Sequence, residues 1–79
     1  EREGKLVRLN YMYYIAKEYY DTAYEAVRDI TEKNGSMALA EFRDRIGTSR
    51  KYAIPILEYM DEKKITKMNG EVRVWNLNS

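Results

Sequence analysis

Apolar side chains between Lys17 and about Lys33 recur at steps of three and four residues. This period places them on one face of an α-helix and leaves charged residues on the other face. Asn34-Gly35 follows as a C-terminal stop, because glycine readily adopts the left-handed backbone that ends many helices. The spacing therefore predicts a helix over residues 17–33. Its buried stripe comprises Tyr20, Ala23, Tyr24, Val27 and Ile30.

Two further helices are predicted, separated by a short turn that begins with a glycine. The first covers residues 39–46. The second starts at Thr48 or Ser49, either of which is a favourable cap, and runs to about Lys63. Pro55 lies beyond its first turn and lacks a backbone N–H, which predicts a bend or a first turn that is not ideal α. The apolar faces are Leu39, Phe42 and Ile46 in the first helix and Ala53, Ile56, Leu57 and Met60 in the second.

A C-terminal β-hairpin is predicted because two alternating runs of apolar and polar residues flank Asn69-Gly70. This dipeptide favours a two-residue type I′ turn. With that turn, Ile65 is expected to pair with Val74 or Trp75 on the core side. The chain order of helix, extended link, helix, tight turn, helix and hairpin is that of a winged helix in the α+β class.

An N-terminal hairpin is predicted from Leu6 to Ile15, with Asn10 as its turn, although one strand running into the helix fits the same residues. Tyr11, Tyr13 and Tyr14 lie in this segment, and strand alternation exposes some of them. We interpret residues 1–16 as a remnant of a preceding winged-helix module that this aromatic patch contacts. Residues 17–79 are then the winged-helix domain itself.

Composition argues against an enzyme. The 79 residues contain no cysteine and no histidine, which excludes disulfides, thiol nucleophiles and Ser-His-Asp chemistry and leaves no zinc-ligand cluster. No phosphate-binding glycine loop is present. Glu58, Asp61 and Glu62 are close in sequence, and we interpret them as a solvated helix face. No catalytic residue, metal site or cofactor is therefore expected. No apolar run approaches the ~20 residues of a membrane span, and the lack of cysteine fits the cytoplasm.

Charge is distributed unevenly along a chain whose net charge is +1. Residues 1–42 hold six basic and eight acidic side chains, whereas residues 43–79 hold eight and five. The start of the third helix combines hydroxyls, cations and free backbone N–H groups, which suits a phosphate. If Asn69-Gly70 is the turn, Lys67 and Arg73 lie diagonally across the hairpin and act together. The candidate nucleic-acid-binding residues are Arg43, Ser49, Arg50, Lys51, Tyr52, Lys67 and Arg73.

The run EFRDRIGTSRKYA at residues 41–53, continued by LEYMD at 57–61, closely resembles the last winged-helix module of SelB, the bacterial selenocysteine-specific elongation factor family. The resemblance covers most of residues 5–75. Ala38 departs from it, since the family often has a threonine there that caps the second helix; its absence costs about 1 kcal/mol of helix stability.

This resemblance implies a translation factor that brings selenocysteyl-tRNA to the ribosome and grips an mRNA hairpin, the SECIS element, near a UGA codon during protein biosynthesis. GTP binding would belong to N-terminal domains absent from this chain. The expected partner is thus an mRNA hairpin bound by a monomer, without a membrane. Two alternatives remain open: a DNA-binding winged-helix regulator, which the acidic distal half of the third helix disfavours, and a protein-interaction winged helix using the tyrosine-rich hairpin.

Overall fold

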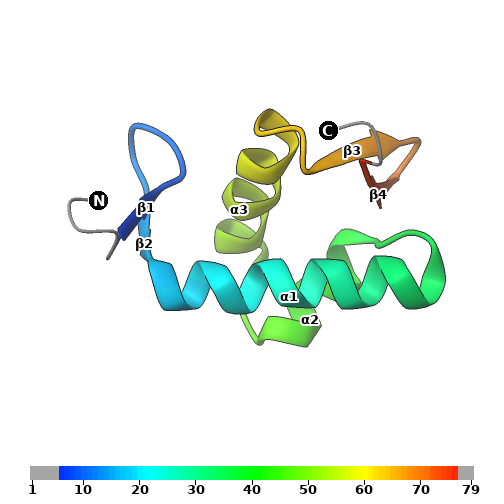
Figure 1. Ribbon diagram of the computed structural model, residues 1–79. Helices are drawn as coiled ribbons and strands as arrows, with labels where there is room; N and C mark the ends of the chain where they lie inside the picture. The colour runs from blue at the N-terminus through cyan, green and yellow to red at the C-terminus, as the bar shows by residue number, and fades with distance from the viewer. Residues whose placement is uncertain (1–5, 77–79) are drawn as a thin grey trace.

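Three helices form the centre of the structure, a computed structural model that describes residues 6–76. They are α1 (Lys17–Asn34), α2 (Leu39–Ile46) and α3 (Arg50–Glu62), and Figure 1 shows α3 rising from the middle of α1 toward the C-terminal strands. Gly35 and Gly47 follow α1 and α2 with φ values of +81° and +69°, so both predicted glycine stops are confirmed. A side chain at either position would be strained by the left-handed backbone.

The wing is an antiparallel hairpin of β3 (Thr66–Asn69) and β4 (Val72–Trp75). The extended link before α2 joins it through two backbone hydrogen bonds: Met37 N–H donates to Arg73 O at 2.8 Å, and Arg73 N–H donates to Met37 O at 2.9 Å. The order of elements is that of a winged helix, so the predicted α+β fold class is confirmed.

The predicted turn of this hairpin is wrong by one residue, which shifts the pairing of the two strands by two residues. Asn69 is paired with Val72, so the connecting loop is Gly70-Glu71. Gly70 has φ +70°, while Lys64 is the one non-glycine residue of positive φ among those described. A type I′ turn needs positive φ at both central residues, so this loop is not of that type. Trp75 pairs with Thr66, and Ile65 lies outside the strand, where its carbonyl accepts from Asn76 N–H at 2.9 Å.

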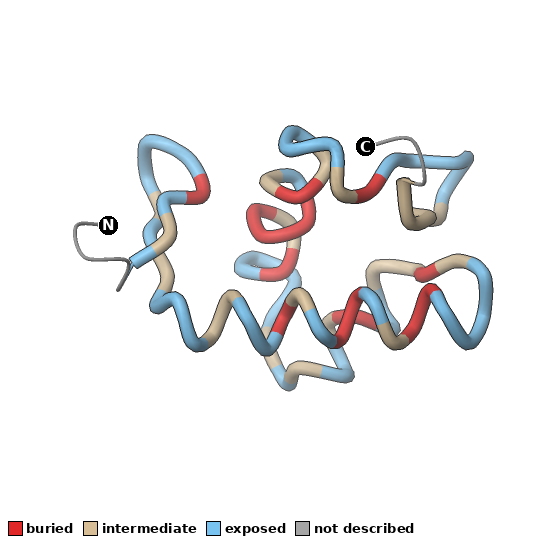
Figure 2. The backbone as a smooth tube through the Cα atoms, viewed as in Figure 1, coloured by how far each residue is buried: buried red, intermediate tan, exposed pale blue. Residues whose placement is uncertain are grey.

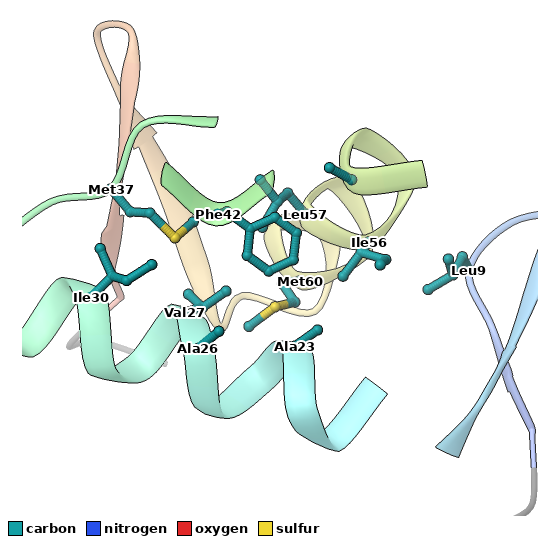
Figure 3. Close-up of a cluster of buried hydrophobic side chains, with 11 residues drawn as sticks. Leu9, Ala23, Ala26, Val27, Ile30, Met37, Phe42, Ile56, Leu57 and Met60 are labelled. Carbon is teal, nitrogen blue, oxygen red and sulfur yellow. The ribbon is translucent and has the colours of Figure 1, made fainter. Parts of the chain in front are cut away.

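The core lies where α1, α2 and α3 meet, and most of the buried residues, red in Figure 2, belong to these three helices. The predicted stripe of α3 is wholly buried, as is Phe42. Tyr20 and Tyr24 are half-buried at the margin, where their rings contact Tyr59 and Trp75 at 5.5 Å. The buried apolar cluster, shown in Figure 3, is Leu9, Ala23, Ala26, Val27, Ile30, Met37, Phe42, Ala53, Ile56, Leu57 and Met60.

Helix α3 starts after Ser49, which occupies the N-cap position, but the Ser49 side chain makes no capping hydrogen bond. Its carbonyl accepts from both Tyr52 N–H at 3.1 Å and Ala53 N–H at 2.9 Å. The shared acceptor departs from the regular α pattern in the first turn, as expected near a helix start. The helix continues through the buried Pro55 to Glu62.

The N-terminal segment is a hairpin and not a single strand. Its strands β1 (Leu6–Arg8) and β2 (Tyr14–Ala16) are antiparallel, with Val7 paired to Ile15. Its loop is longer than the predicted Asn10 turn, since it spans residues 9–13. Leu9 in this loop is only 7% exposed and belongs to the core, and Figure 3 shows it reaching toward Ile56.

Candidate nucleic-acid interface

The first turn of α3 presents two cations to solvent. Arg50 and Lys51 are exposed, and neither forms an ion pair with a residue in 6–76. Their backbone N–H groups donate no backbone hydrogen bond to any described residue. Free N–H groups at a helix N-terminus carry partial positive charge, which adds to that of the two side chains. This turn can therefore hold a phosphate without first breaking an internal salt bridge.

Polar and aromatic groups extend the same surface. The Ser49 hydroxyl is exposed beside the two cations and makes no capping bond, so it is available to a ligand. Tyr52 is 47% exposed. The Lys51 ammonium lies 5.7 Å from the centre of the Tyr52 ring, and the ring of Tyr13 meets Tyr52 edge to face at 6.0 Å. The exposed part of the Tyr52 ring is a surface on which an unpaired base can stack.

The two arginines of α2 differ in their ion-pair partners. Arg43 is partly exposed, with Nε 3.2 Å from a carboxylate oxygen of its exposed neighbour Asp44. Arg45 Nη2 lies 2.8 Å from Asp29 Oδ2 and so connects α2 to α1. The hydrogen bond from Arg45 lowers the pKa of the Asp29 carboxyl, with Lys33 adding to the effect. Arg43 is therefore the more available of the two for a ligand.

Arg73 is turned into the fold. Its Nη2 donates to Asp61 Oδ2 at 2.8 Å and its Nε to Asp61 Oδ1 at 3.2 Å, while the Arg73 side chain is only 14% exposed. Thr66 Oγ1 donates to the same carboxylate at 2.6 Å. The guanidinium thus joins the wing to α3 and has little surface left for an external phosphate.

Lys67 and Arg73 do not act together, contrary to the prediction. Lys67 pairs with Val74 and Arg73 with Met68, so the two side chains leave the hairpin on opposite faces. A loop at Asn69-Gly70 would give the same result: Lys67 would then pair with Val72, and Arg73, next to Val72 in its strand, would still lie on the other face. Lys67 is exposed and borders a groove of about 930 Å³, whose other lining residues include Tyr24, Arg28, Val74 and Trp75.

The predicted residues consequently occupy two places and not one edge. The wing is attached through Asp61, which lies about 17 Å along α3 from Arg50 at ~1.5 Å per residue. Ser49, Arg50, Lys51 and Tyr52 form the start of α3, and Arg43 lies next to it in the fold, since its carbonyl accepts from Thr48 N–H at 3.1 Å. Lys67 lies apart, at the other end of that helix.

Sequence reasoning missed Tyr13 as a neighbour of Tyr52, and it missed Asp61 as the partner of Arg73. Neither contact has a signal in the local sequence, since the partners lie far apart along the chain. Within residues 6–76, no group of three or more acidic side chains is placed to hold a metal ion. No helix in that range has the length and apolar character that crossing a membrane requires.

The sequence is similar to known translation factors. Residues 29–75 match the family described as "Elongation factor SelB, winged helix". The selenocysteine-specific elongation factor of Desulfomicrobium baculatum is 41% identical over 71 residues, which is 90% of this chain and 11% of that protein. Its counterpart in Escherichia coli K12 is 48% identical over 44 residues, 56% of this chain and 7% of that protein. The chain therefore spans a small part of these relatives.

Solved structures show the same fold. The mRNA-binding domain of elongation factor SelB from E. coli, in complex with SECIS RNA, has a TM-score of 0.83 and 31% identity, covering 95% of this chain and 62% of that chain. A bacterial selenocysteine-specific elongation factor EF-Sec has a TM-score of 0.77 and 24% identity, covering 94% of this chain and 12% of that one. The second likeness concerns the fold alone.

Proposed function

Because this chain belongs to the winged-helix family of elongation factor SelB, we propose that it binds an mRNA hairpin of the SECIS type. In this proposal the module tethers a selenocysteine-specific elongation factor near a UGA codon on the ribosome, in the cytoplasm. The module acts as a monomer and performs no catalysis itself. Nucleotide binding belongs to other domains of the longer factor.

The observation that carries the proposal is the pair of exposed cations, Arg50 and Lys51, at the open N-terminus of α3. Side-chain charge, backbone N–H groups and the Ser49 hydroxyl together suit the phosphates of a tight RNA loop. Arg43, one turn before the end of α2, supplies a third cation to this surface. We place Lys67 at a separate, secondary contact and assign Arg73 to the structure of the wing.

Recognition of an RNA loop fits this geometry better than insertion of α3 into a duplex. The major groove of A-form RNA is deep and narrow, so sequence-specific proteins read unpaired bases in loops and bulges. The exposed Tyr52 ring beside Arg50 and Lys51 offers such a base a stacking surface. Glu58 and Glu62 are exposed further along α3, where they would repel the phosphates of a DNA groove.

We propose that residues 1–16 are a remnant of a preceding winged-helix module, which packs through the buried Leu9 on the RNA-binding domain of residues 17–79; residues 1–5 and 77–79 lie outside the described range. Side chains alternate along the two strands, so every second one lies on the outer face of the hairpin, where a second module can cover it. Leu6 is 45% exposed and Tyr14 is 48% exposed on that face, and Tyr11 at the loop is 82% exposed. A neighbouring module would bury this apolar surface.

The test is a titration of the purified chain against three labelled probes at two salt concentrations. The probes are the SECIS RNA hairpin of the E. coli complex, the same stem with a scrambled loop, and a DNA duplex of matched length. We expect the intact loop to bind most tightly and its affinity to fall as salt rises, because phosphate contacts release counterions. Equal binding to all three probes would contradict loop recognition and leave only a basic surface.

A further inference from the structure

The N-terminal hairpin meets the start of α3 where the Tyr13 ring contacts the Tyr52 ring edge to face at 6.0 Å. Tyr13 lies outside residues 29–75, the part that matches the SelB winged-helix family. Building on the proposed function, we propose that Tyr13 is a positioning residue of the RNA site, holding the Tyr52 ring where an unpaired loop base stacks.

Tyr13 is itself held firmly by its loop. Its backbone N–H donates to Asn10 Oδ1 at 3.0 Å, and its carbonyl accepts from Leu9 N–H at 2.9 Å. The Asn10 side chain also accepts from Met12 N–H at 2.8 Å. Leu9 anchors the same loop in the core at 7% exposure. A side chain on this loop therefore has a defined place relative to α3.

Tyr52 has few other restraints. It is 47% exposed, and within residues 6–76 its ring contacts the Tyr13 ring and, at 5.7 Å, the Lys51 ammonium. An exposed tyrosine without a packed neighbour samples several rotamers, and ordering it on binding costs conformational entropy. The edge-to-face contact with Tyr13 removes part of that cost before RNA arrives. Lys51 then lies beside the ring, near the phosphates that flank a stacked base.

This arrangement gives the hairpin a role in selecting RNA. Phosphate contacts by Arg50 and Lys51 act on any loop, whereas stacking on Tyr52 acts only where a base is unpaired and reachable. Loss of Tyr13 should therefore lower loop selectivity and leave the electrostatic part of binding intact. A purely structural role for Tyr13 would weaken binding to every RNA alike.

The experiment compares variants of the 79-residue chain by fluorescence anisotropy, using the intact-loop hairpin and a fully paired RNA duplex of matched length at two salt concentrations. Tyr13→Ala should lower intact-loop affinity by about three- to tenfold, while affinity for the paired duplex, which offers no unpaired base, and the salt dependence stay unchanged. Tyr13→Phe keeps the ring and should bind like the unaltered chain. Tyr11→Ala is the matched control, since Tyr11 lies in the same loop at 82% exposure.

A double-mutant cycle completes the test. In a Tyr52→Ala background, Tyr13→Ala should cause no further loss, because the two residues act through one ring contact. Additive losses, equal losses on both RNAs, or the same loss in Tyr11→Ala would each overturn the inference. If circular dichroism shows Tyr13→Ala partly unfolded, Tyr13→Leu replaces it with similar bulk and no ring.

The outcomes separate this inference from the function on which it rests. Lack of loop preference in the unaltered chain overturns the proposed function and the inference together. A clear loop preference that Tyr13→Ala leaves intact overturns the inference alone.

Discussion

Arg73 on the wing and Asp61 on α3 form a two-point ion pair, with Nη2 2.8 Å from Oδ2 and Nε 3.2 Å from Oδ1. The side chains are 14% and 25% exposed. A paired guanidinium and carboxylate in this fork geometry fix both distance and orientation. This pair, together with the hydrogen bond from Thr66, sets how the wing sits on the helical core.

Arg73→Ala should lower the free energy of unfolding by about 2 kcal/mol, because it leaves the half-buried Asp61 carboxylate without its charged donor. Arg73→Lys should recover only part of this loss, since lysine lacks the fork. Urea denaturation measures both. Affinity of the folded variant for the SECIS hairpin should change by less than about threefold, as for a distant charge. Unchanged stability with a much larger loss of affinity would return Arg73 to the RNA contacts.

Arg50→Ala should weaken SECIS hairpin binding by at least about 1.5 kcal/mol, or roughly tenfold, because it removes a charge-assisted contact. Folding should be unaffected, since Arg50 is exposed and forms no ion pair within residues 6–76. Lys33→Ala removes the same charge from the exposed end of α1 and serves as the control. Equal affinities of the two variants would refute the assignment of Arg50.

Ala38→Thr should stabilise the chain by about 1 kcal/mol by completing a cap on α2. Half of a capping box is already present, since Glu41 Oε1 accepts from Ala38 N–H at 2.8 Å. An added hydroxyl would accept from the Glu41 N–H in return. Thermal unfolding measures the gain. Ala40→Ser, inside the helix, should give none, and a similar gain there would argue against capping as the cause.

Lys64→Gly should raise stability by about 0.5–1 kcal/mol, because Lys64 has φ +67° and glycine adopts this backbone without strain. The end of α3 is a Schellman motif: Ile65 N–H donates to Met60 O at 2.9 Å and Lys64 N–H to Asp61 O at 3.0 Å. Lys63 has φ −81°, so Lys63→Gly should instead destabilise. In chemical denaturation, Lys64→Gly should raise the free energy of unfolding and Lys63→Gly should lower it.

The free energy of unfolding should fall as pH rises from 10 to 12. Burial, followed by the nearby Tyr59 and Tyr24 hydroxyls, raises the pKa of Tyr20 from 10.0 to about 12. Between these values the unfolded chain releases a proton that the folded chain retains, so alkali favours unfolding. Tyr20→Phe should flatten this part of the pH profile measured by urea denaturation. An identical slope in both proteins would show that other groups cause the loss.

The sequence alone determined the three helices and most of their buried faces. The three- and four-residue steps along residues 17–33, the glycines that end α1 and α2, and the buried stripe of α3 all depend on neighbours close in the chain. Local propensity and periodicity act at that range, so the sequence pattern by itself predicts these helices and their buried faces. The resemblance to SelB also indicated the start of α3, because it rests on the identities of consecutive residues between 41 and 61.

The tertiary structure decided which residues far apart in the sequence contact each other. The packing of the wing on α3 turned Arg73 inward to Asp61, while Lys67 is exposed on the opposite face of the hairpin. The anchored Leu9 loop brought Tyr13 to Tyr52. Register and long-range ion pairs follow from how whole faces pack, and a one-residue shift that local sequence barely distinguishes changes every partner. Charge and residue type were visible in the sequence, but which cations remain free for RNA was not.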